Sequence, residues 1–231
     1  MAVKSLAIIS EAVARRFAKE YSVALLSNSP QPFPHMIEDI NNFGGNTAFR
    51  KIASHFPGAL LAAAAYNPPE RFREKRHTKH DEYNLMEDFH KQTYSNHSSG
   101  EGVFNFARHT LPLLRDAKRD LQYPPTLLIT GSAASVTGFP RLASYSAGKF
   151  AIRGLAHSLA REDAPQGIHV AHIIAHGRLE KSEFAIERYT HPIGNARKVA
   201  DTYWDLHVEK DPNEFTLEYD LRDKESSKLH P

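Results

Sequence analysis

Cysteine is absent from this chain of 231 residues. Disulfide bonds, thiolate metal sites and a cysteine nucleophile are therefore excluded, and the composition suits a reducing compartment such as the cytoplasm. Long hydrophobic runs are lacking too, because the longest, residues 59–66, is far shorter than the roughly 20 residues of a membrane-spanning helix. The apolar stretch at the N-terminus is too short for a secretory signal. We therefore expect a cytoplasmic protein without a membrane segment.

An excess of charge of one sign is also lacking. The formal net charge is +2, which is too small to indicate binding to nucleic acid or to a membrane surface. Residues 71–80 are basic, but acidic residues follow them directly, which favours a solvated helical face. His169 and His172 lie three apart on a predicted strand and so point to opposite faces. We expect no nucleic-acid partner and no metal site.

Short β-rich runs alternate with helical stretches along the chain. Strands are predicted at 5–9, 22–27, 126–130, 168–175 and 215–221, and helices at 11–20, 104–117, 143–161 and 196–209. Residues 59–66 fit a buried strand, although their alanines suit a helix equally well. Near-continuous apolar strands separated by helices indicate an α/β fold with a parallel sheet that is covered on both faces. Such a fold places its ligand site beyond the carboxyl ends of the strands.

The residues most suggestive of chemistry follow the predicted strand at 126–130. Gly131 and Ser132 come directly after it, and Tyr145 and Lys149 lie one helical turn apart, so the two share a helix face. A phenol with a pKa of about 10 is a poor acid or base at neutral pH, and a neighbouring ammonium favours the phenolate. Tyr-x-x-x-Lys alone is most often an ordinary surface pair. The strand, Gly-Ser, spacer and Tyr-x-x-x-Lys together are much more specific.

The stretch "LLITGSAASVTGFPRLASYSAGKFAIRGLAHSLARE", followed by "GIHVAHIIAHG", resembles the short-chain dehydrogenase/reductase family. The resemblance implies a Rossmann-type, doubly wound parallel sheet and a nicotinamide cofactor, NADP or NAD. It also implies that Ser132, Tyr145 and Lys149 are catalytic. In this family the tyrosine passes a proton to or from the substrate oxygen, the serine orients the substrate, and the lysine also binds the nicotinamide ribose.

The same resemblance predicts how the chain is organised. It implies a single Rossmann-like domain over residues 1–231, with a dinucleotide-binding half at 1–70 and a catalytic half at 103–222. Residues 177–194 correspond to the segment that governs substrate specificity in the family, and we expect them to form a substrate lid. Members of the family usually pair through helices, so a homodimer or homotetramer is expected.

The N-terminal half departs from the family pattern and is expected to be shortened. The family has a glycine-rich turn between its first strand and first helix, where backbone N–H groups approach the pyrophosphate. Here no glycine separates residues 5–9 from 11–20. Ser10 remains as a favoured helix cap and is the expected remnant of an anion site. The family's third strand is expected to be missing.

Other cofactor contacts are carried over from the family pattern by position. Asn28 follows the second strand, where it suits a ribose hydroxyl or a phosphate, and Asn67 follows the fourth. Ser182 replaces a threonine that grips the carboxamide, and Tyr145 and Lys149 complete the set. Together these changes predict a weakened cofactor site.

Three functions are consistent with this pattern. The leading hypothesis is an NAD(P)-dependent oxidoreductase that transfers a hydride between the nicotinamide cofactor and a small carbonyl or alcohol substrate. The second keeps the same catalytic residues without a cofactor, in an isomerase, dehydratase or cyclase. The third is a catalytically inactive, truncated relative that acts as a partner subunit. The missing glycine loop favours the second and third.

Overall fold

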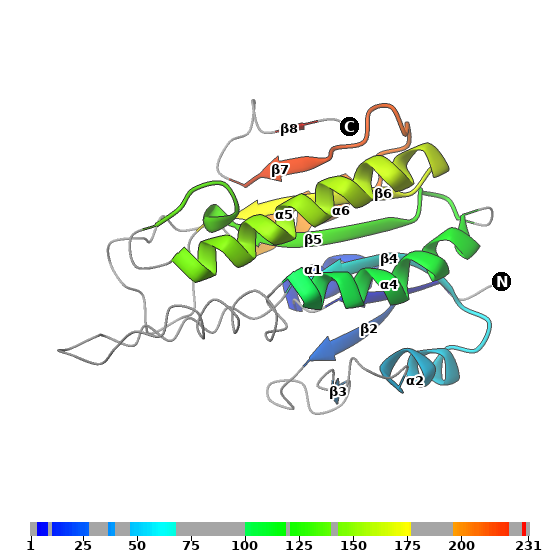
Figure 1. Cartoon of the computed structure of the whole chain (residues 1–231). Coiled ribbons are helices and arrows are strands. Elements are labelled where there is room, and N and C mark those ends of the chain that lie inside the picture. The colour runs from blue at the N-terminus through cyan, green and yellow to red at the C-terminus, as the bar shows by residue number, and fades with distance from the viewer. Residues whose placement is uncertain are drawn as a thin grey trace.

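The computed structural model describes residues 4–8, 11–27, 37–39, 47–67, 100–118, 121–139, 143–176, 196–221 and 228–229. Its strands are β1 (Lys4–Ile8), β2 (Ser22–Ser27), β3 (Ile37–Asp39), β4 (Leu60–Tyr66), β5 (Thr126–Ser132), β6 (His169–Ala175), β7 (Glu218–Asp220) and β8 (Lys228–Leu229). They form one sheet in the order β3-β2-β1-β4-β5-β6-β7-β8 (Figure 1). The neighbouring pairs from β3 to β7 are parallel, and β8 runs antiparallel to β7.

Helices cover both faces of this sheet. They are α1 (Glu11–Phe17), α2 (Thr47–His55), α4 (Gly100–Ala117), α5 (Ala143–Asp163) and α6 (Ala196–His207), with short 3-10 turns η2 (Ala133–Ser135) and η3 (Ala164–Gln166). The helices α4 and α5 lie on the face turned towards the viewer in Figure 1, and α1 and α6 lie behind the sheet. This layered arrangement confirms the predicted Rossmann-type α/β fold, and strands from both halves of the chain share the one sheet.

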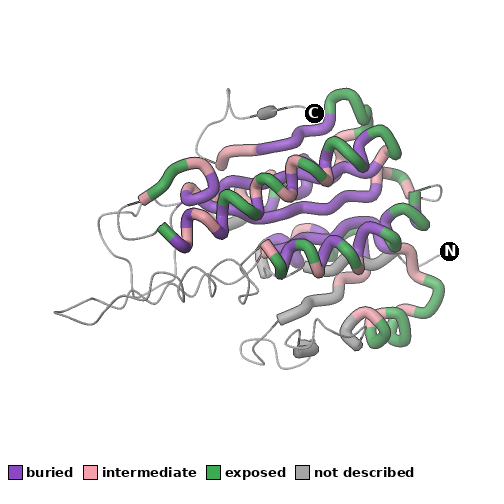
Figure 2. The backbone as a smooth tube through the Cα atoms, in the orientation of Figure 1, coloured by how far each residue is buried: buried purple, intermediate pink, exposed green. Residues whose placement is uncertain are grey.

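The central strands are buried on both faces, as their unbroken apolar sequences predict. Every residue of β5 is buried, and β4 and β6 are buried at all but one position each (Figure 2). On the α4/α5 face, Phe106, Ile129 and Ile152 belong to one hydrophobic cluster. On the α1/α6 face, Phe17 and Trp204 belong to a second cluster, and their rings meet edge to face at a centroid distance of 5.1 Å.

The structure decides between strand and helix for one predicted segment and shortens another predicted strand. Residues 59–66, which fitted a strand or a helix, contain β4, because they lie between two other central strands and extended backbone completes their hydrogen bonding. The strand predicted at 215–221 is shorter and covers only Glu218–Asp220. Phe215 and Leu217, which precede β7, are nevertheless buried. The apolar pattern therefore predicted which residues are buried, but not how far the hydrogen bonding of the strand extends.

The expectation of a missing third strand is wrong. Strand β3 pairs in parallel with β2, and Leu25 lies opposite Ile37. Its position beside β2 at the edge of the sheet is the third-strand position of the order 3-2-1-4-5-6. The strand has three residues, two of which are acidic. So short an edge strand has too little hydrophobic patterning to be recognised in the sequence.

The first connection of the sheet is short. Strand β1 ends at Ile8 and α1 begins at Glu11, and no glycine stands between them. Helix α1 itself has seven residues. None of the helices that the structure describes is both long and apolar enough to cross a membrane.

A buried hydrogen-bonded network fastens α6 at the amino edge of the sheet. His207, the last residue of α6, is fully buried, and its Nδ1 lies 2.9 Å from the hydroxyl of Thr126 at the start of β5. The Thr126 hydroxyl donates to the Pro124 carbonyl oxygen, so it accepts the Nδ1–H of His207. The other ring nitrogen then accepts the hydroxyl proton of Tyr21, at 2.8 Å. The neutral ring therefore satisfies both of its hydrogen bonds.

Candidate active site

Two of the predicted site residues lie at the carboxyl edge of the sheet. Ser132 is the last residue of β5, and its register partner on β6 is Ala175. Asn67 follows the last residue of β4 and is partly buried. Because β4 and β5 are parallel neighbours, these two polar residues end up at the same edge, where ligands bind in this fold.

Local hydrogen bonds fix the orientation of Ser132. It caps the 3-10 turn η2, and its Oγ accepts the Ala134 N–H at 3.3 Å. Its own N–H donates to Ser135 Oγ at 3.0 Å. Together the two hydrogen bonds form a capping box between Ser132 and Ser135. Among the described residues, none accepts the Ser132 hydroxyl proton. The hydroxyl is thus held in place as a hydrogen-bond donor.

The residue before Ser132 has to be glycine because two side chains approach it closely. A Cβ at residue 131 would overlap His172 Nε2 and would lie 2.6 Å from Ser135 Oγ. His172 and Ser135 are both fully buried, so neither can move aside without disturbing the core. The Gly-Ser pair is therefore a packing requirement of this strand end as well as part of the motif.

Tyr145 and Lys149 lie in the first turns of α5, as the sequence predicts. Lys149 is 2% exposed, Tyr145 is partly exposed, and the Lys149 Nζ lies 5.5 Å from the centre of the Tyr145 ring. Helix α5 packs against η2 and β5, so it brings this pair to the strand end that carries Ser132. A buried ammonium beside a phenol and a fixed hydroxyl donor is a suitable arrangement for moving a proton on and off a substrate oxygen.

The remaining sequence predictions fall on other parts of the chain. Ser10, Asn28 and Ser182 lie outside the described residues, as does the predicted lid at 177–194. Their roles in cofactor or substrate binding stay predictions. His169 and His172 do point to opposite faces: His169 Nδ1 lies 2.8 Å from a carbonyl oxygen of α6, whereas His172 faces α5.

A cluster of four side chains lies behind the site and was not found from the sequence. We call Arg153, His157, His172 and Glu218 the Glu218 cluster. Arg153 donates from Nε to Glu218 Oε2 at 2.6 Å and from Nη2 to Oε1 at 2.9 Å. His157 Nε2 and His172 Nδ1 each lie 3.0 Å from Oε2. One signal in the sequence was available, because Lys149, Arg153 and His157 repeat at four-residue spacing on α5.

The protonation states of the Glu218 cluster follow from burial and hydrogen bonding. Burial alone would raise the pKa of Glu218, but hydrogen bonds from His172 and Arg153 lower it to about 2. Burial lowers the pKa of His157 and of His172, against the opposing effect of the carboxylate. His172 Nε2 has no hydrogen-bond partner among the described residues, which agrees with a neutral ring that carries its proton on Nδ1.

His157, His172 and Glu218 also have the spacing of metal ligands, with ligand atoms within 4.8 Å of one another. Arg153, however, already donates to both carboxylate oxygens. A divalent ion bound to the carboxylate would lie against this guanidinium, and like charges at such a distance repel each other. The contacts of Arg153 therefore favour an ion-pair cluster over a metal centre.

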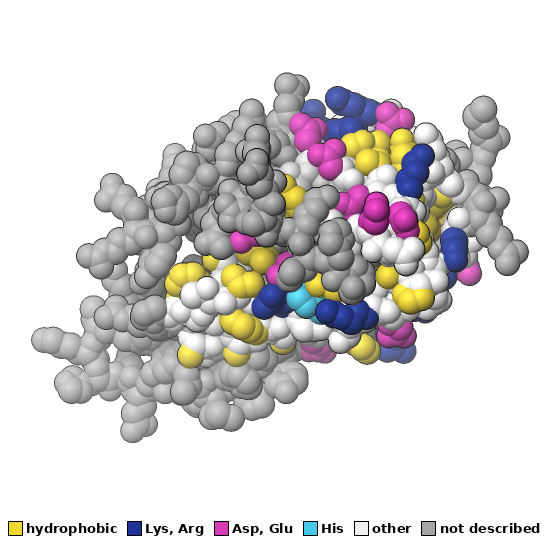
Figure 3. All heavy atoms as spheres, turned by 90° about the horizontal axis from the view of Figure 1, so that it is seen from above, with side chains coloured by type: hydrophobic (Ala, Val, Ile, Leu, Met, Phe, Trp, Pro, Cys, Tyr) yellow, Lys and Arg dark blue, Asp and Glu magenta, His cyan; other side chains and the backbone are white. Residues whose placement is uncertain are grey.

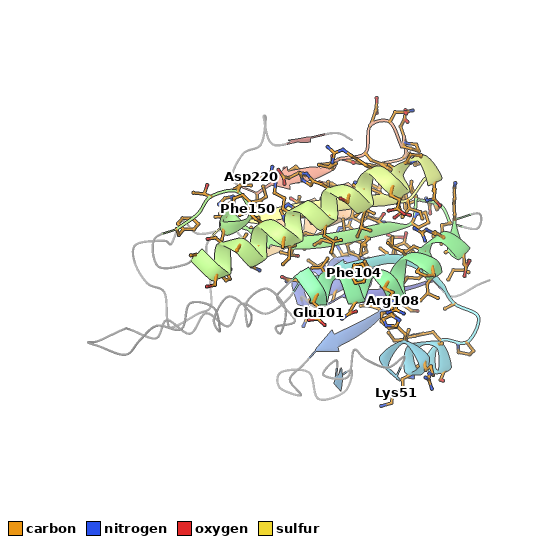
Figure 4. The ribbon with its side chains drawn as sticks, viewed as in Figure 1. Lys51, Glu101, Phe104, Arg108, Phe150 and Asp220 are labelled. Carbon is orange, nitrogen blue, oxygen red and sulfur yellow. The ribbon has the colours of Figure 1, made fainter. Side chains whose placement is uncertain are left out.

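A further pair lies at the same edge of the sheet as Ser132. His176 follows the last residue of β6, and its Nε2 lies 2.9 Å from Asp220 Oδ1 on β7. Asp220 is the last residue of β7, and Figure 4 labels it at the end of that strand, above α5. On the face seen in Figure 3, acidic and basic side chains of the described residues lie interspersed, which matches the near-balanced composition.

The comparisons with known proteins agree with this geometry. Residues 83–186 match the family profile of the short chain dehydrogenases, a range that includes Ser132, Tyr145 and Lys149. This segment belongs to the short-chain dehydrogenase family. The resemblance predicted from the sequence is therefore confirmed. No curated protein matches the sequence.

Several solved structures share the fold over nearly the whole chain. A short-chain dehydrogenase from Rhodopseudomonas palustris is 20% identical with a TM-score of 0.65, and the match covers 96% of this chain and 99% of that one. ElxO with NADP bound is 20% identical with a TM-score of 0.68, over 95% and 98% of the two chains. An NADH-dependent reductase complexed with NAD is 15% identical with a TM-score of 0.69, over 95% of each.

Proposed function

We propose that this short-chain dehydrogenase is an NAD(P)-dependent oxidoreductase that interconverts a small carbonyl compound and its alcohol. The observation that carries the proposal is the placement of Tyr145 and Lys149 on the helix that packs against the Ser132 turn. Two of the solved structures with the same fold have NADP or NAD bound. The absence of cysteine, in turn, supports a cytoplasmic location.

Each residue of the site has a distinct part in the proposed reaction. The Ser132 hydroxyl donates a hydrogen bond to the substrate oxygen and holds the carbonyl carbon in place. The Tyr145 phenol gives its proton to that oxygen as negative charge develops there, and takes the proton back in the reverse direction. The Lys149 ammonium lies beside the phenol and stabilises the phenolate that remains. A nicotinamide cofactor, when bound beside these residues, would supply or accept the hydride.

The residues present fit the nicotinamide half of such a cofactor better than its phosphates. Tyr145, Lys149 and Asn67 offer phenol, ammonium and amide groups at the carboxyl edge, and these suit ribose hydroxyls. At the other end, α1 is short and no glycine precedes it, so the usual backbone cradle for the pyrophosphate is lacking. We therefore propose a weakened cofactor site in which most of the recognition comes from the nicotinamide ribose.

A thermal-shift titration with NADH and NADPH tests cofactor binding. A ligand that binds only the folded protein stabilises it by about 2.7 kcal/mol at a hundredfold excess over Kd. We expect a concentration-dependent rise in Tm with at least one of the two cofactors. Adenosine monophosphate at equal concentration is the control, because it lacks the nicotinamide ribose and should give a much smaller rise.

A second candidate function is favoured by the short connection between β1 and α1. In that case the Ser132, Tyr145 and Lys149 set would act without a cofactor, as an isomerase, dehydratase or cyclase that moves protons only. No rise in Tm at millimolar NADH or NADPH would favour this candidate over the oxidoreductase.

We also propose that two copies pair through α4 and α5. Phe104, Leu113 and Phe150 are large apolar side chains on these helices, and they are 53%, 42% and 43% exposed. Figure 4 labels Phe104 and Phe150 on the two adjacent helices. Glu101 and Arg108 lie on either side of Phe104 along α4, so a two-fold axis can pair opposite charges across the interface.

Replacing both phenylalanines tests this interface. We expect Phe104→Glu combined with Phe150→Glu to convert the dimer, or a higher assembly, into smaller species, because charged groups would be buried without partners. Sedimentation equilibrium at micromolar concentration measures the mass. Lys51→Glu on the exposed side of α2 is the control and should leave the mass unchanged. A wild-type protein that sediments as a monomer would contradict the proposal.

A further inference from the structure

We propose that Glu218 is a positioning residue that sets the catalytic helix against the strand end carrying Ser132. The inference rests on the proposed function, because it assigns to the Glu218 cluster the task of placing Tyr145 and Lys149. One carboxylate on β7 binds side chains from two elements, α5 and β6. Helix α5 carries Tyr145, and β6 is the register neighbour of β5, the strand that ends in Ser132.

On the helix side, Glu218 binds α5 at two successive turns. Arg153 makes a two-pronged contact with both carboxylate oxygens, and such bidentate pairs fix orientation as well as distance. His157 adds a third contact one turn later. Tyr145, Lys149, Arg153 and His157 follow at four-residue intervals, so the face of α5 that Glu218 holds continues directly into the catalytic face.

On the strand side, Glu218 fixes the ring that packs behind Ser132. Glu218 and His172 are register partners on β7 and β6, and the His172 Nδ1–H donates to the carboxylate. This bond orients the imidazole so that its opposite edge fills the space beside Gly131, where even a Cβ would not fit. A rotation of the His172 ring would therefore press on Gly131 and move Ser132.

The ionisation states of the Glu218 cluster suit a role in positioning α5. Glu218 and Arg153 neutralise each other, and both imidazoles are neutral because burial disfavours their charged forms. The carboxylate is 6% exposed at its side chain and the arginine 30%. The ion pair between Arg153 and Glu218 is thus largely shielded from solvent, which strengthens it. The outer side of the guanidinium remains in contact with solvent.

The same helix offers a matched control at its other end. Arg115 on α4 donates from Nε and Nη2 to Asp163 Oδ1, at 3.0 and 2.7 Å, and Asp163 is fully buried. This ion pair also fastens α5. Asp163 is eighteen residues beyond Tyr145, or roughly 27 Å along the helix, whereas Arg153 is roughly 12 Å away. Loss of either pair weakens the fold, but only one pair adjoins the catalytic turn.

The experiment compares Arg153→Met with Arg115→Met in the full chain. Tyrosines are labelled with carbon-13 at the carbon that bears the hydroxyl, and Tyr145→Phe assigns the Tyr145 resonance among the nine. We expect both variants to lower Tm and only Arg153→Met to displace the Tyr145 resonance. With NADPH and para-nitrobenzaldehyde as probe substrate, Arg153→Met should lower kcat about tenfold or more, since small misplacements have large effects on rate.

Two milder variants keep the test decisive if Arg153→Met does not fold. Arg153→Lys keeps the charge but loses the bidentate contact with Glu218. His157→Gln keeps a hydrogen-bond donor on a side chain of similar length. Each should displace the Tyr145 resonance in the same direction, by less. The proposal is overturned if these variants leave the resonance where Arg115→Met leaves it. Failure of the oxidoreductase proposal is separate: NADPH would not bind the wild type, while the resonance would still respond to Arg153.

Discussion

Tyr145→Phe should lower kcat by about a hundredfold to ten-thousandfold, the usual contribution of a positioned acid or base. The substitution removes only the hydroxyl. The ring stays beside the Lys149 ammonium, so its packing in α5 should change little, and cofactor affinity should fall only by the loss of one hydrogen bond to the ribose. Steady-state kinetics with the better of NADH and NADPH and a reactive aromatic aldehyde measures kcat, and the thermal-shift titration measures cofactor affinity in the same preparation.

Tyr203→Phe is the matched control for this experiment. Tyr203 is buried on α6, and its hydroxyl lies 2.6 Å from Thr130 Oγ1 on the opposite face of the sheet. We expect this variant to lose some stability and to keep its turnover. If Tyr145→Phe kept wild-type kcat, or if the two variants lost turnover to the same extent, Tyr145 would not be the proton donor.

Acidification should unfold the protein through His207, the second large effect that the structure predicts. Burial lowers the pKa of His207 to about 3, and the electrostatic interaction with nearby His169 lowers it further. The neutral ring satisfies its hydrogen bonds to Tyr21 and Thr126 in full. In the unfolded chain the same imidazole has its ordinary pKa of about 6.5.

The direction of the pH dependence follows from proton binding in the two states. Between about pH 6.5 and pH 3 the unfolded chain holds one proton on His207 that the folded protein excludes. The free energy of unfolding therefore decreases on acidification by about 1.4 kcal/mol per pH unit, or about 3 kcal/mol by pH 4. This contribution is fully present above pH 6.5 and is lost as the pH falls. Urea unfolding at a series of pH values measures the slope.

His207→Asn isolates this contribution, because the amide keeps a donor for Thr126 and does not titrate. The variant should be less stable at pH 7, and its stability should depend on pH less steeply, by about 1.4 kcal/mol per unit below pH 6. His55→Asn on the exposed part of α2 controls for loss of a histidine as such. An unchanged slope in His207→Asn would show that His207 is protonated equally in both states.

The parts of the fold that the sequence predicts well are those with strong local patterns. The unbroken apolar runs of β5 and β6 and the amphipathic α4 and α6 appear in the structure close to their expected positions. The short edge strand β3 was missed and the extent of β7 was overestimated, because three residues carry too little periodicity. Their pairing is set by neighbouring strands, which a local pattern does not describe.

The candidate site likewise has one part that the sequence predicts and one part that it does not. Ser132, Tyr145 and Lys149 were predicted because they lie within eighteen residues of one another and follow a family motif. The Glu218 cluster joins residues up to 65 positions apart, and only the register of β6 with β7 brings them together. Two of its members, Arg153 and His157, lie on the face of α5 that the motif had already identified. A search along that face at four-residue steps would have found them.

The central claim is that a nicotinamide cofactor binds beside Tyr145, and one measurement addresses it without knowledge of the substrate. Wild-type protein labelled on its tyrosine rings is titrated with NADPH and NADH while the Tyr145 resonance is followed. We predict a saturable displacement of the Tyr145 resonance. The resonances of Tyr203, a residue of α6, and of Tyr21, which contacts α6 through His207, should be nearly unchanged. A cofactor that does not bind, or that binds and leaves the Tyr145 resonance in place, would contradict the claim.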